Sequence, residues 1–70
     1  MSRRERVCSC LTSEWQTTHQ ILDVLKAKYG DSCTITKVYR VLDSERKYRL
    51  VEKDIVVKGN SKTAIWRLPE

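Results

Sequence analysis

Three cysteines and one histidine are the four side chains of this sequence that suggest a structural zinc site. Structural zinc sites pair their ligands across gaps of about two to four residues. Cys8 and Cys10 enclose a single residue, and neither Cys33 nor His19 has a partner at the required spacing. We therefore expect no metal and no other cofactor, and we interpret Cys8 and Cys33 as inward-facing thiols that act as small apolar groups. The odd number of cysteines favours free thiols in a reducing cytoplasm.

Catalysis finds little support in the sequence. The sequence has a single histidine, no paired carboxylates in an apolar setting and no glycine-rich loop that could hold a phosphate. The 70 residues form one domain, 1–70. A chain of this size buries only about 60% of the surface of its unfolded form, which is too little for an enclosed catalytic cleft. We predict a binding protein, not an enzyme.

A cationic helix is predicted at TITKVYRVLD, residues 34–43. Its apolar residues recur at the spacing of one helix face, and the pattern predicts a helix over about residues 35–47. The opposite face carries polar and cationic side chains, namely Thr36, Lys37, Tyr39, Arg40, Asp43 and Lys47. The major groove of DNA admits such a helix, and its long donors can reach base edges or phosphates. A face that is merely solvated is the alternative.

These side chains have different expected roles at DNA. Arg40 could pair bidentately with guanine or with a phosphate, Lys37 suits a phosphate, and Tyr39 could contact either. Asp43 is a poor neighbour for a phosphate. We expect it to orient Arg40 or Lys47.

The period of the apolar residues changes from helical to two in residues 51–68. A two-residue turn at Gly59 and Asn60 predicts a β-hairpin with a fixed register. That register pairs Lys58 with Ser61, Val57 with Lys62, Ile55 with Ala64, Lys53 with Trp66, Val51 with Leu68 and, on the opposite face, Glu52 with Arg67. One face then gathers the apolar residues Val51, Ile55, Val57, Ala64, Trp66 and Leu68. A slip by one residue would scatter this set, so the agreement supports the hairpin.

Two further clusters could contact DNA. They are Lys58, Asn60, Ser61 and Lys62 at the predicted hairpin tip, 58–62, and Arg3, Arg4 and Arg6 near the N-terminus. The tip fits a contact with the phosphate backbone or the minor groove, although hairpin tips are polar in any case. The arginines form either a flexible arm on the DNA backbone or a terminus that is only solvated.

Two helices are predicted before residue 30. The first covers residues 3–11 and ends near residues 12 and 13. Thr17 and Gln20 fit a capping box that starts the second helix, 18–29, and Gly30 supplies the left-handed residue that ends it. The inward residues are expected to be Val7, Cys8 and Leu11 of the first helix and Ile21, Leu22, Leu25 and Tyr29 of the second.

The start of the second helix has one competing interpretation. Ser13 also has a glutamine three residues later and could cap a longer helix. We prefer Thr17, because residues 14–16 then form a short extended segment. Trp15 is then free to pack across the sheet.

The net charge is +5, with a sequence pI of about 9.4. Most of the excess lies in residues 34–70, which hold nine Lys and Arg against five Asp and Glu. A polyanionic partner is therefore expected, ahead of solubility alone. No apolar run approaches the roughly 18 residues that span a bilayer, and the N-terminus lacks the apolar core of a signal peptide. We expect no membrane contact and a cytoplasmic location, on the nucleoid in a bacterium or archaeon.

Together these elements predict an α+β fold with the order helix, short strand, helix, helix and C-terminal two-stranded β-hairpin. This order, with a basic third helix and a basic tip, resembles a winged helix-turn-helix domain. The segments EWQTTHQI and TKVYRVLDSERKYRLVEK look most like the DNA-binding half of the ferric uptake regulator family. In that family a Thr-Val-Tyr-Arg-type run opens the recognition helix. Here Lys37, Val38, Tyr39 and Arg40 occupy the run, after Thr36.

The sequence departs from that family in three ways. The metal-sensing dimerisation domain of the family has no counterpart here, and the first helix is short. Tyr48 and Arg49 stand where the family ends its helix with a small residue and Gly. The resemblance implies a fold and a mode of DNA binding, but not iron sensing.

We therefore predict a regulator of transcription that binds double-stranded DNA. The recognition helix, about 35–47, would enter the major groove, and the wing tip, 58–62, would contact the backbone or the minor groove. Two alternatives stay open, because fold does not settle function: a winged-helix protein–protein interaction module and a binder of structured RNA. A homodimer also stays open, through the first helix or through Val56 and Ile65 of the hairpin.

Overall fold

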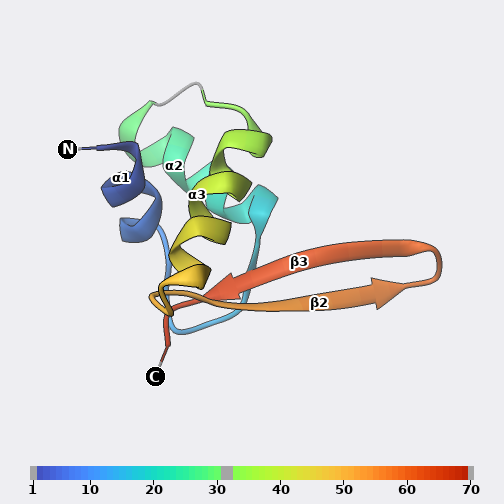
Figure 1. The fold of residues 1–70 in the computed structure, drawn as a ribbon. Coiled ribbons are helices and arrows are strands. Elements are labelled where there is room, and N and C mark those ends of the chain that lie inside the picture. Colours follow the sequence, from blue (N-terminus) through green and yellow to red (C-terminus); the bar gives the residue numbers. More distant parts are fainter. Residues whose placement is uncertain (1, 31–32, 70) are drawn as a thin grey trace.

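The computed structural model describes residues 2–30 and 33–69, which form three helices and a three-stranded antiparallel sheet (Figure 1). The elements are α1 (Arg3–Ser9), β1 (Gln16–Thr17), α2 (Thr18–Tyr29), α3 (Ile35–Lys47), β2 (Glu52–Lys58) and β3 (Ser61–Arg67). Strand β3 lies between β1 and β2. The α+β class and the predicted order of elements are confirmed. Within the described residues, no helix is both long and apolar enough to cross a membrane.

Helix α2 begins and ends where its capping residues predict. Thr17 Oγ1 accepts a hydrogen bond from the Gln20 N–H at 3.1 Å, and Gln20 Oε1 accepts one from the Thr17 N–H at 2.8 Å. This capping box satisfies two amides at the helix start that have no helical carbonyl to bind. Gly30 ends the helix with φ +64°, a conformation that a residue with a Cβ resists. Thr17 is thus confirmed as the cap, and the alternative cap at Ser13 is wrong.

Helix α1 ends at Ser9, before the predicted end near residues 12 and 13. The N–H groups of Cys10 and Leu11 donate to carbonyls three residues before them, at 3.1 and 3.2 Å, so the chain tightens at this end. Cys10 is buried there, with 4% of its surface exposed. Cys8, which was predicted to face inward, is only half-buried. Val7 and Leu11 are buried as predicted.

Helix α3 covers the predicted residues 35–47 and has an unusual C-terminal end. Arg49 has φ +61°, in the left-handed region that Gly normally occupies at a helix stop. The Arg49 N–H donates to the Arg46 carbonyl and the Leu50 N–H to the Glu45 carbonyl, both at 3.0 Å. This pair of bonds is the Schellman pattern of a helix end. The chain therefore keeps the geometry of a glycine stop with a residue that is strained in it.

The β-hairpin has the predicted register. Strands β2 and β3 pair Glu52 with Arg67, Lys53 with Trp66, Ile55 with Ala64, Val57 with Lys62 and Lys58 with Ser61. Gly59 has φ +58° while Asn60 keeps a negative φ, as in a type II′ turn. The ladder stops one step short of the predicted pair of Val51 with Leu68.

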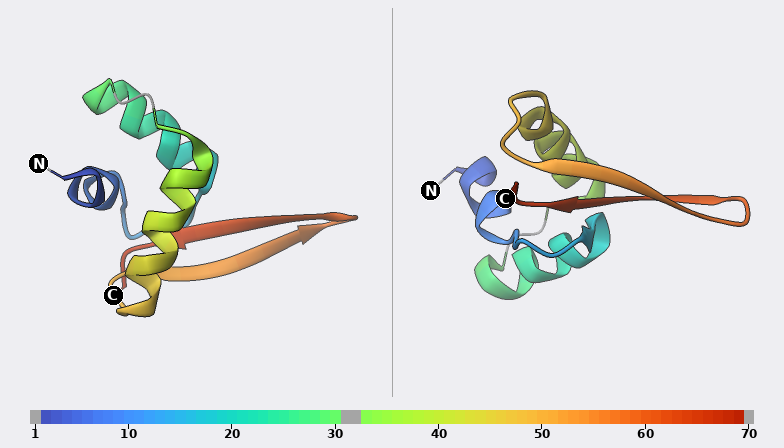
Figure 2. Two further views of the ribbon diagram at one scale, coloured as in Figure 1. Left: turned by 45° about the horizontal axis from the view of Figure 1, so that its top comes forward. Right: turned by 90° about the horizontal axis from the view of Figure 1, so that it is seen from below.

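The hairpin extends well beyond the helices, as Figure 1 and Figure 2 show. At its base, Val51 and Trp66 are buried, whereas Ile55 and Val57 on the same face are 51% and 60% exposed. The predicted apolar face is therefore buried only at the base. Alternation fixes which residues share a face, but it does not say how far the helices reach along that face.

Trp66 joins the base of the hairpin to two helices. Its indole Nε1 donates to Thr18 Oγ1 of α2 at 2.9 Å, and both residues are buried. Its ring meets the ring of Tyr39 from α3 edge-on, with centroids 5.3 Å apart. All three helices supply the core cluster to which it belongs, including Val7, Ile21, Leu25, Val38 and Leu42.

Trp15 packs less deeply than predicted. It is 38% exposed, and the Arg67 guanidinium lies 4.4 Å from its ring centroid. Arg67 Nε also donates to Glu52 Oε2 at 2.8 Å, in the predicted cross-strand pair. Trp15 thus packs on a cation of β3 and not in the core.

Replacement of Arg49 by Gly should stabilise the fold. Glycine relieves the left-handed strain, which costs about 1–2 kcal/mol, although its freedom in the unfolded chain offsets part of the gain. We expect the free energy of unfolding to rise by about 0.5–1 kcal/mol, and Tm by about 2–8 °C, in urea and thermal denaturation. Arg49→Ala removes the same charge but keeps a Cβ, so it is the control and should not stabilise. Equal stability of the two variants would contradict the strain.

Candidate nucleic-acid interface

An open groove of about 660 Å³ lies between the N-terminal half of α3, the start of α2 and the hairpin. Its α3 wall consists of Ile35, Thr36, Tyr39, Arg40 and Asp43, and its hairpin wall of Lys62, Thr63 and Ala64. Side chains from two clusters that are separate in the sequence therefore border one hollow. The predicted residues of α3 and the tip that lie outside its lining are Lys37, Lys47, Lys58, Asn60 and Ser61, all exposed.

Three side chains of the first turns of α3 are free to bind a ligand. Thr36, Lys37 and Arg40 are exposed, and their side chains make no polar contact with other residues that the structure describes. Lys37 and Arg40 are three positions apart, so they are neighbours on the helix surface. Because no carboxylate among the described residues pairs with either, this part of α3 attracts anions.

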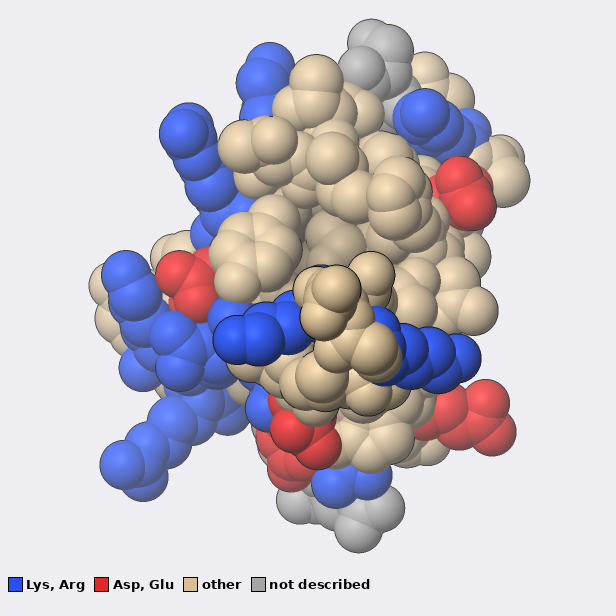
Figure 3. Space-filling view, turned by 90° about the vertical axis from the view of Figure 1, so that its right-hand side faces the viewer, with Lys and Arg blue, Asp and Glu red and all other residues tan. Residues whose placement is uncertain are grey.

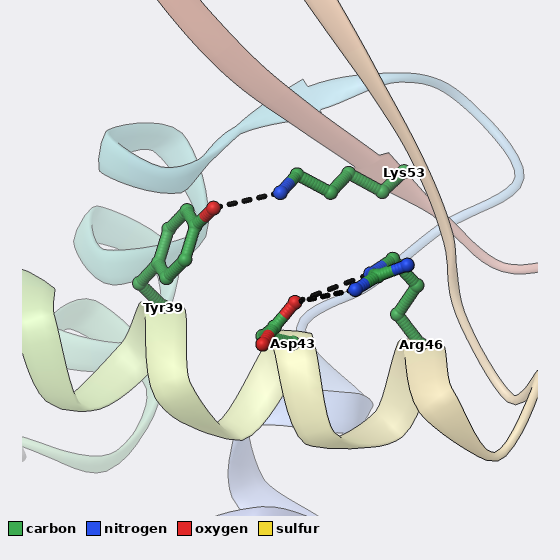
Figure 4. Close-up of polar contacts among 4 residues, drawn as sticks. All are labelled: Tyr39, Asp43, Arg46 and Lys53. Atoms are coloured by element: carbon green, nitrogen blue, oxygen red, sulfur yellow. Dashed lines mark hydrogen bonds and ion pairs between the residues drawn. The ribbon is translucent and has the colours of Figure 1, made fainter.

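Tyr39 serves both the packing of α3 and the surface of the groove. Its hydroxyl oxygen accepts a hydrogen bond from Lys53 Nζ at 2.7 Å (Figure 4). The Lys53 ammonium also lies 5.0 Å from the Tyr39 ring centroid and 5.3 Å from that of Trp66. A phenol that accepts this bond still has its own proton to donate. Tyr39 is thus held in place by the sheet and keeps one donor for a ligand.

Asp43 has a different partner from those predicted. Its Oδ1 accepts hydrogen bonds from Arg46 Nε at 3.1 Å and Nη2 at 3.0 Å (Figure 4), and not from Arg40 or Lys47. The hydrogen bond from Arg46 is the main cause that lowers the pKa of Asp43, and nearby cationic charges lower it further. Asp43 therefore neutralises Arg46 and leaves the Arg40 guanidinium uncompensated.

The hairpin tip presents cations on both faces of the sheet. Lys62 is paired with Val57, on the face that packs against α3 at its base, and alternation places Lys58 on the other face. Figure 3, viewed toward the tip, shows Lys and Arg side chains on both sides of it and a larger group at one side of the molecule. Lys62 faces the groove and Lys58 faces away from it.

The three N-terminal arginines belong to α1 and do not form a flexible arm. Arg4 Nε forms an ion pair with Glu45 of α3, whose carboxylate is buried. The Arg6 guanidinium lies 5.7 Å from the ring centroid of Tyr29 in α2. Arg3 is exposed. Arg4 and Arg6 thus contact the other helices, and a contact of the three arginines with DNA stays a prediction.

Glu45 and Lys53 shape this region without standing out in the sequence. Glu45 follows Val38 and Leu42 at helical spacing, which places it on the buried stripe. A glutamate is nevertheless rarely buried unless it is paired, so its residue type argues for the surface. The register places Lys53 on the face that packs on α3, but the reach of its ammonium to Tyr39 is a tertiary contact that no local pattern predicts.

The described thiols and carboxylates form no candidate metal site. Within residues 2–30 and 33–69, no group of three or more His, Cys, Asp or Glu side chains could hold an ion. Burial raises the pKa of Cys10, and burial and the Glu45 carboxylate raise that of Cys8. Both therefore stay protonated near neutral pH, whereas metals bind the thiolate. Cys33 is buried before α3, as predicted.

Comparison with known proteins assigns no function to the chain. No protein-family model matches the chain, and no curated protein matches it.

Loss of Arg4 should destabilise the fold, because it leaves the Glu45 carboxylate buried without its ion-pair partner. The Arg4 side chain is 60% exposed, so we expect a moderate loss of about 1–3 kcal/mol for Arg4→Ala in urea denaturation. Arg3→Ala removes the same charge from an exposed position and should stay within about 0.5 kcal/mol of the parent. Glu45→Gln in the Arg4→Ala background should restore part of the loss. If the two single variants are equally stable, the ion pair does not hold α1 on α3.

Proposed function

We propose that this protein is a winged helix-turn-helix protein that binds double-stranded DNA and regulates transcription. Helix α3 lies in the major groove, and the β2–β3 hairpin, as the wing, contacts the backbone or the minor groove. One observation carries the proposal: Thr36 and Arg40 of α3, which have no polar partner among the described residues, line a groove that Lys62 of the hairpin also borders. The resemblance to the DNA-binding half of the ferric uptake regulator family supports the same function.

Arg40, Lys37 and Tyr39 have different roles at DNA, because their side chains differ in chemistry. The Arg40 guanidinium is a planar fork that matches guanine O6 and N7 or two phosphate oxygens. Lys37 is a point charge suited to a phosphate, and the free proton of Tyr39 can be donated to a phosphate oxygen. Arg40 therefore supplies sequence preference, whereas the lysines position the protein on the duplex.

The charge of the chain sets how strongly the complex depends on salt. With a net charge of +5, affinity comes mainly from the neutralisation of phosphates and falls as salt rises. The acidic residues of this region reduce that attraction little, since Asp43 is paired with Arg46 and Glu45 with Arg4. This function places the protein with DNA in the cytoplasm, on the nucleoid in a bacterium or archaeon.

A protein-binding role is the second candidate, and one observation favours it. Ile55, Val56 and Val57 of β2 form an exposed apolar run, at 51%, 38% and 60% exposure. Exposed apolar runs on sheet edges attract other chains. None of the three residues lines the groove beside α3, so a protein contact on β2 leaves the cationic surface available.

Arg40→Ala tests whether α3 reads DNA. The variant should unfold within about 0.5 kcal/mol of the parent, because Arg40 is exposed. It should lose roughly 1–3 kcal/mol of binding to a duplex selected from a random pool, and with it part of the preference for that duplex. Lys26→Ala, which removes an exposed cation from α2, is the matched control and should bind like the parent. If Arg40→Ala also binds selected and random duplexes like the parent, α3 does not read DNA. Preference for an RNA hairpin over every duplex would identify an RNA binder.

Lys62→Ala tests the wing. Loss of one phosphate contact should weaken binding to all duplexes alike and should lower the slope of log affinity against log salt by about one unit. Fluorescence anisotropy at several salt concentrations measures this slope, with Lys26→Ala again as the control. An unchanged slope would mean that the tip stays in water.

A further inference from the structure

The outer edge of β2 has backbone groups available for another strand. Strand β3 lies between β1 and β2, so within the described residues nothing pairs with the outer side of β2. Lys58 and Ser61 close a two-residue turn and form a hydrogen-bonded pair, so Ile55 and Val57 direct their N–H and C=O groups outward. The Ile55 N–H agrees with this alternation, since it donates to the carboxylate of its neighbour Asp54 at 2.8 Å.

The side chains along this edge are exposed and ordered by type. All residues from Asp54 to Lys58 are exposed. Three of them, Ile55, Val56 and Val57, are apolar and β-branched, and residues of opposite charge stand at the two ends. Natural edge strands of this kind are usually covered or interrupted, because they pair readily with a further strand.

We propose that β2 binds β2 of a second copy of this chain, antiparallel, with Val56 on the two-fold axis. In this register Val56 lies opposite Val56 of the second copy, and Ile55 lies opposite Val57 of the second copy. Asp54 lies opposite Lys58 of the second copy, and symmetry repeats both contacts. Each apolar side chain thus meets an apolar one and each charge meets its opposite, combinations that stabilise cross-strand pairs.

The neighbouring register lacks this complementarity. With Ile55 opposite Ile55 of the second copy, Asp54 would face Val56 and Lys53 would face Val57. The proposed register also uses the outward N–H and C=O groups of Ile55 and Val57. Ile55 of each copy forms a hydrogen-bonded pair with Val57 of the other copy, and the two residues of such a pair exchange two N–H···O bonds. In the pair, the Ile55 N–H donates to the carbonyl of Val57 of the second copy and no longer to Asp54. The Asp54 carboxylate can then pair with Lys58 of the second copy. In the free chain the Asp54 carboxylate accepts a hydrogen bond from the Ile55 N–H, so this local bond competes with pairing and weakens self-association.

The geometry around β2 leaves room for the second hairpin. An open hollow of about 390 Å³ lies beside Arg46, Lys53, Asp54 and Ile55, where the tip of the second hairpin would arrive. Antiparallel pairing keeps each face of the sheet continuous, so both α3 helices stand on the same side of the joined sheet. If the proposed DNA binding holds, the pair presents two recognition helices to one duplex, a point that rests on that function.

Analytical ultracentrifugation without DNA, over micromolar to millimolar concentrations, tests the pairing with charge-reversed variants. Asp54→Lys and Lys58→Asp each place like charges opposite one another at both symmetric sites. Each should weaken self-association by at least about tenfold. An equimolar mixture of the two variants restores opposite charges at both sites and should associate at least as well as the parent. Lys62→Asp makes the same charge change on β3, away from the edge, and should dimerise more than either edge variant does. Circular dichroism confirms that all variants fold.

A parent that stays monomeric at every concentration overturns the proposal, as does a mixture that associates no better than its components. If the parent dimerises and both Asp54→Lys and Lys58→Asp dimerise equally well, the proposal is also overturned, because the interface then lies on a surface other than the edge of β2. The DNA titration of Arg40→Ala is read separately. A monomer that binds DNA through Arg40 would reject this dimer and keep the proposed function, whereas a charge-dependent dimer without DNA affinity would keep the dimer and reject that function.

Discussion

The indole of Trp66 is the contact on which the arrangement of helices and hairpin depends. It is fully buried, donates a hydrogen bond to Thr18 of α2, and meets the ring of Tyr39 from α3. A buried N–H must find an acceptor, so the Thr18 hydroxyl fixes where the start of α2 lies relative to β3. The same ring sets the distance between α3 and the sheet. The hairpin extends beyond the helices from this junction (Figure 2), and Ile55 and Val57 of β2 are 51% and 60% exposed there.

The fold is predictable from sequence wherever the signal is local. A capping box, a glycine stop and a two-residue turn each act within a few residues, and Thr17, Gly30 and the Lys58–Ser61 pair lie where these motifs predict. The predictions of burial are wrong where tertiary packing, and not a local pattern, determines which side chains are buried. The reach of the helices along the hairpin face determines that Trp66 is buried and Val57 exposed. A tightened last turn, not helical spacing, brings Cys10 inward in place of Cys8.

The candidate site shows the same division between local pattern and tertiary partner. Helical spacing predicts the exposed face of α3, and the structure gives that face its Thr36, Lys37 and Arg40. Helical spacing does not predict which charged side chains form ion pairs, because a helical residue has several neighbours within reach. Asp43 binds Arg46, and Arg4 is drawn to the buried Glu45. These pairings keep the carboxylates of Asp43 and Glu45 from competing for Arg40.

Chemical-shift mapping tests the central claim, that the face of α3 and the hairpin tip form one DNA-binding surface. Uniformly ¹⁵N-labelled protein is titrated with a short random-sequence duplex and followed by two-dimensional ¹H–¹⁵N NMR. We expect salt-sensitive shifts that concentrate in residues 36–40 and 58–62, while α1 and the C-terminal half of α2 stay unchanged. Shifts confined to α1 and α2, or none at low salt, would contradict it.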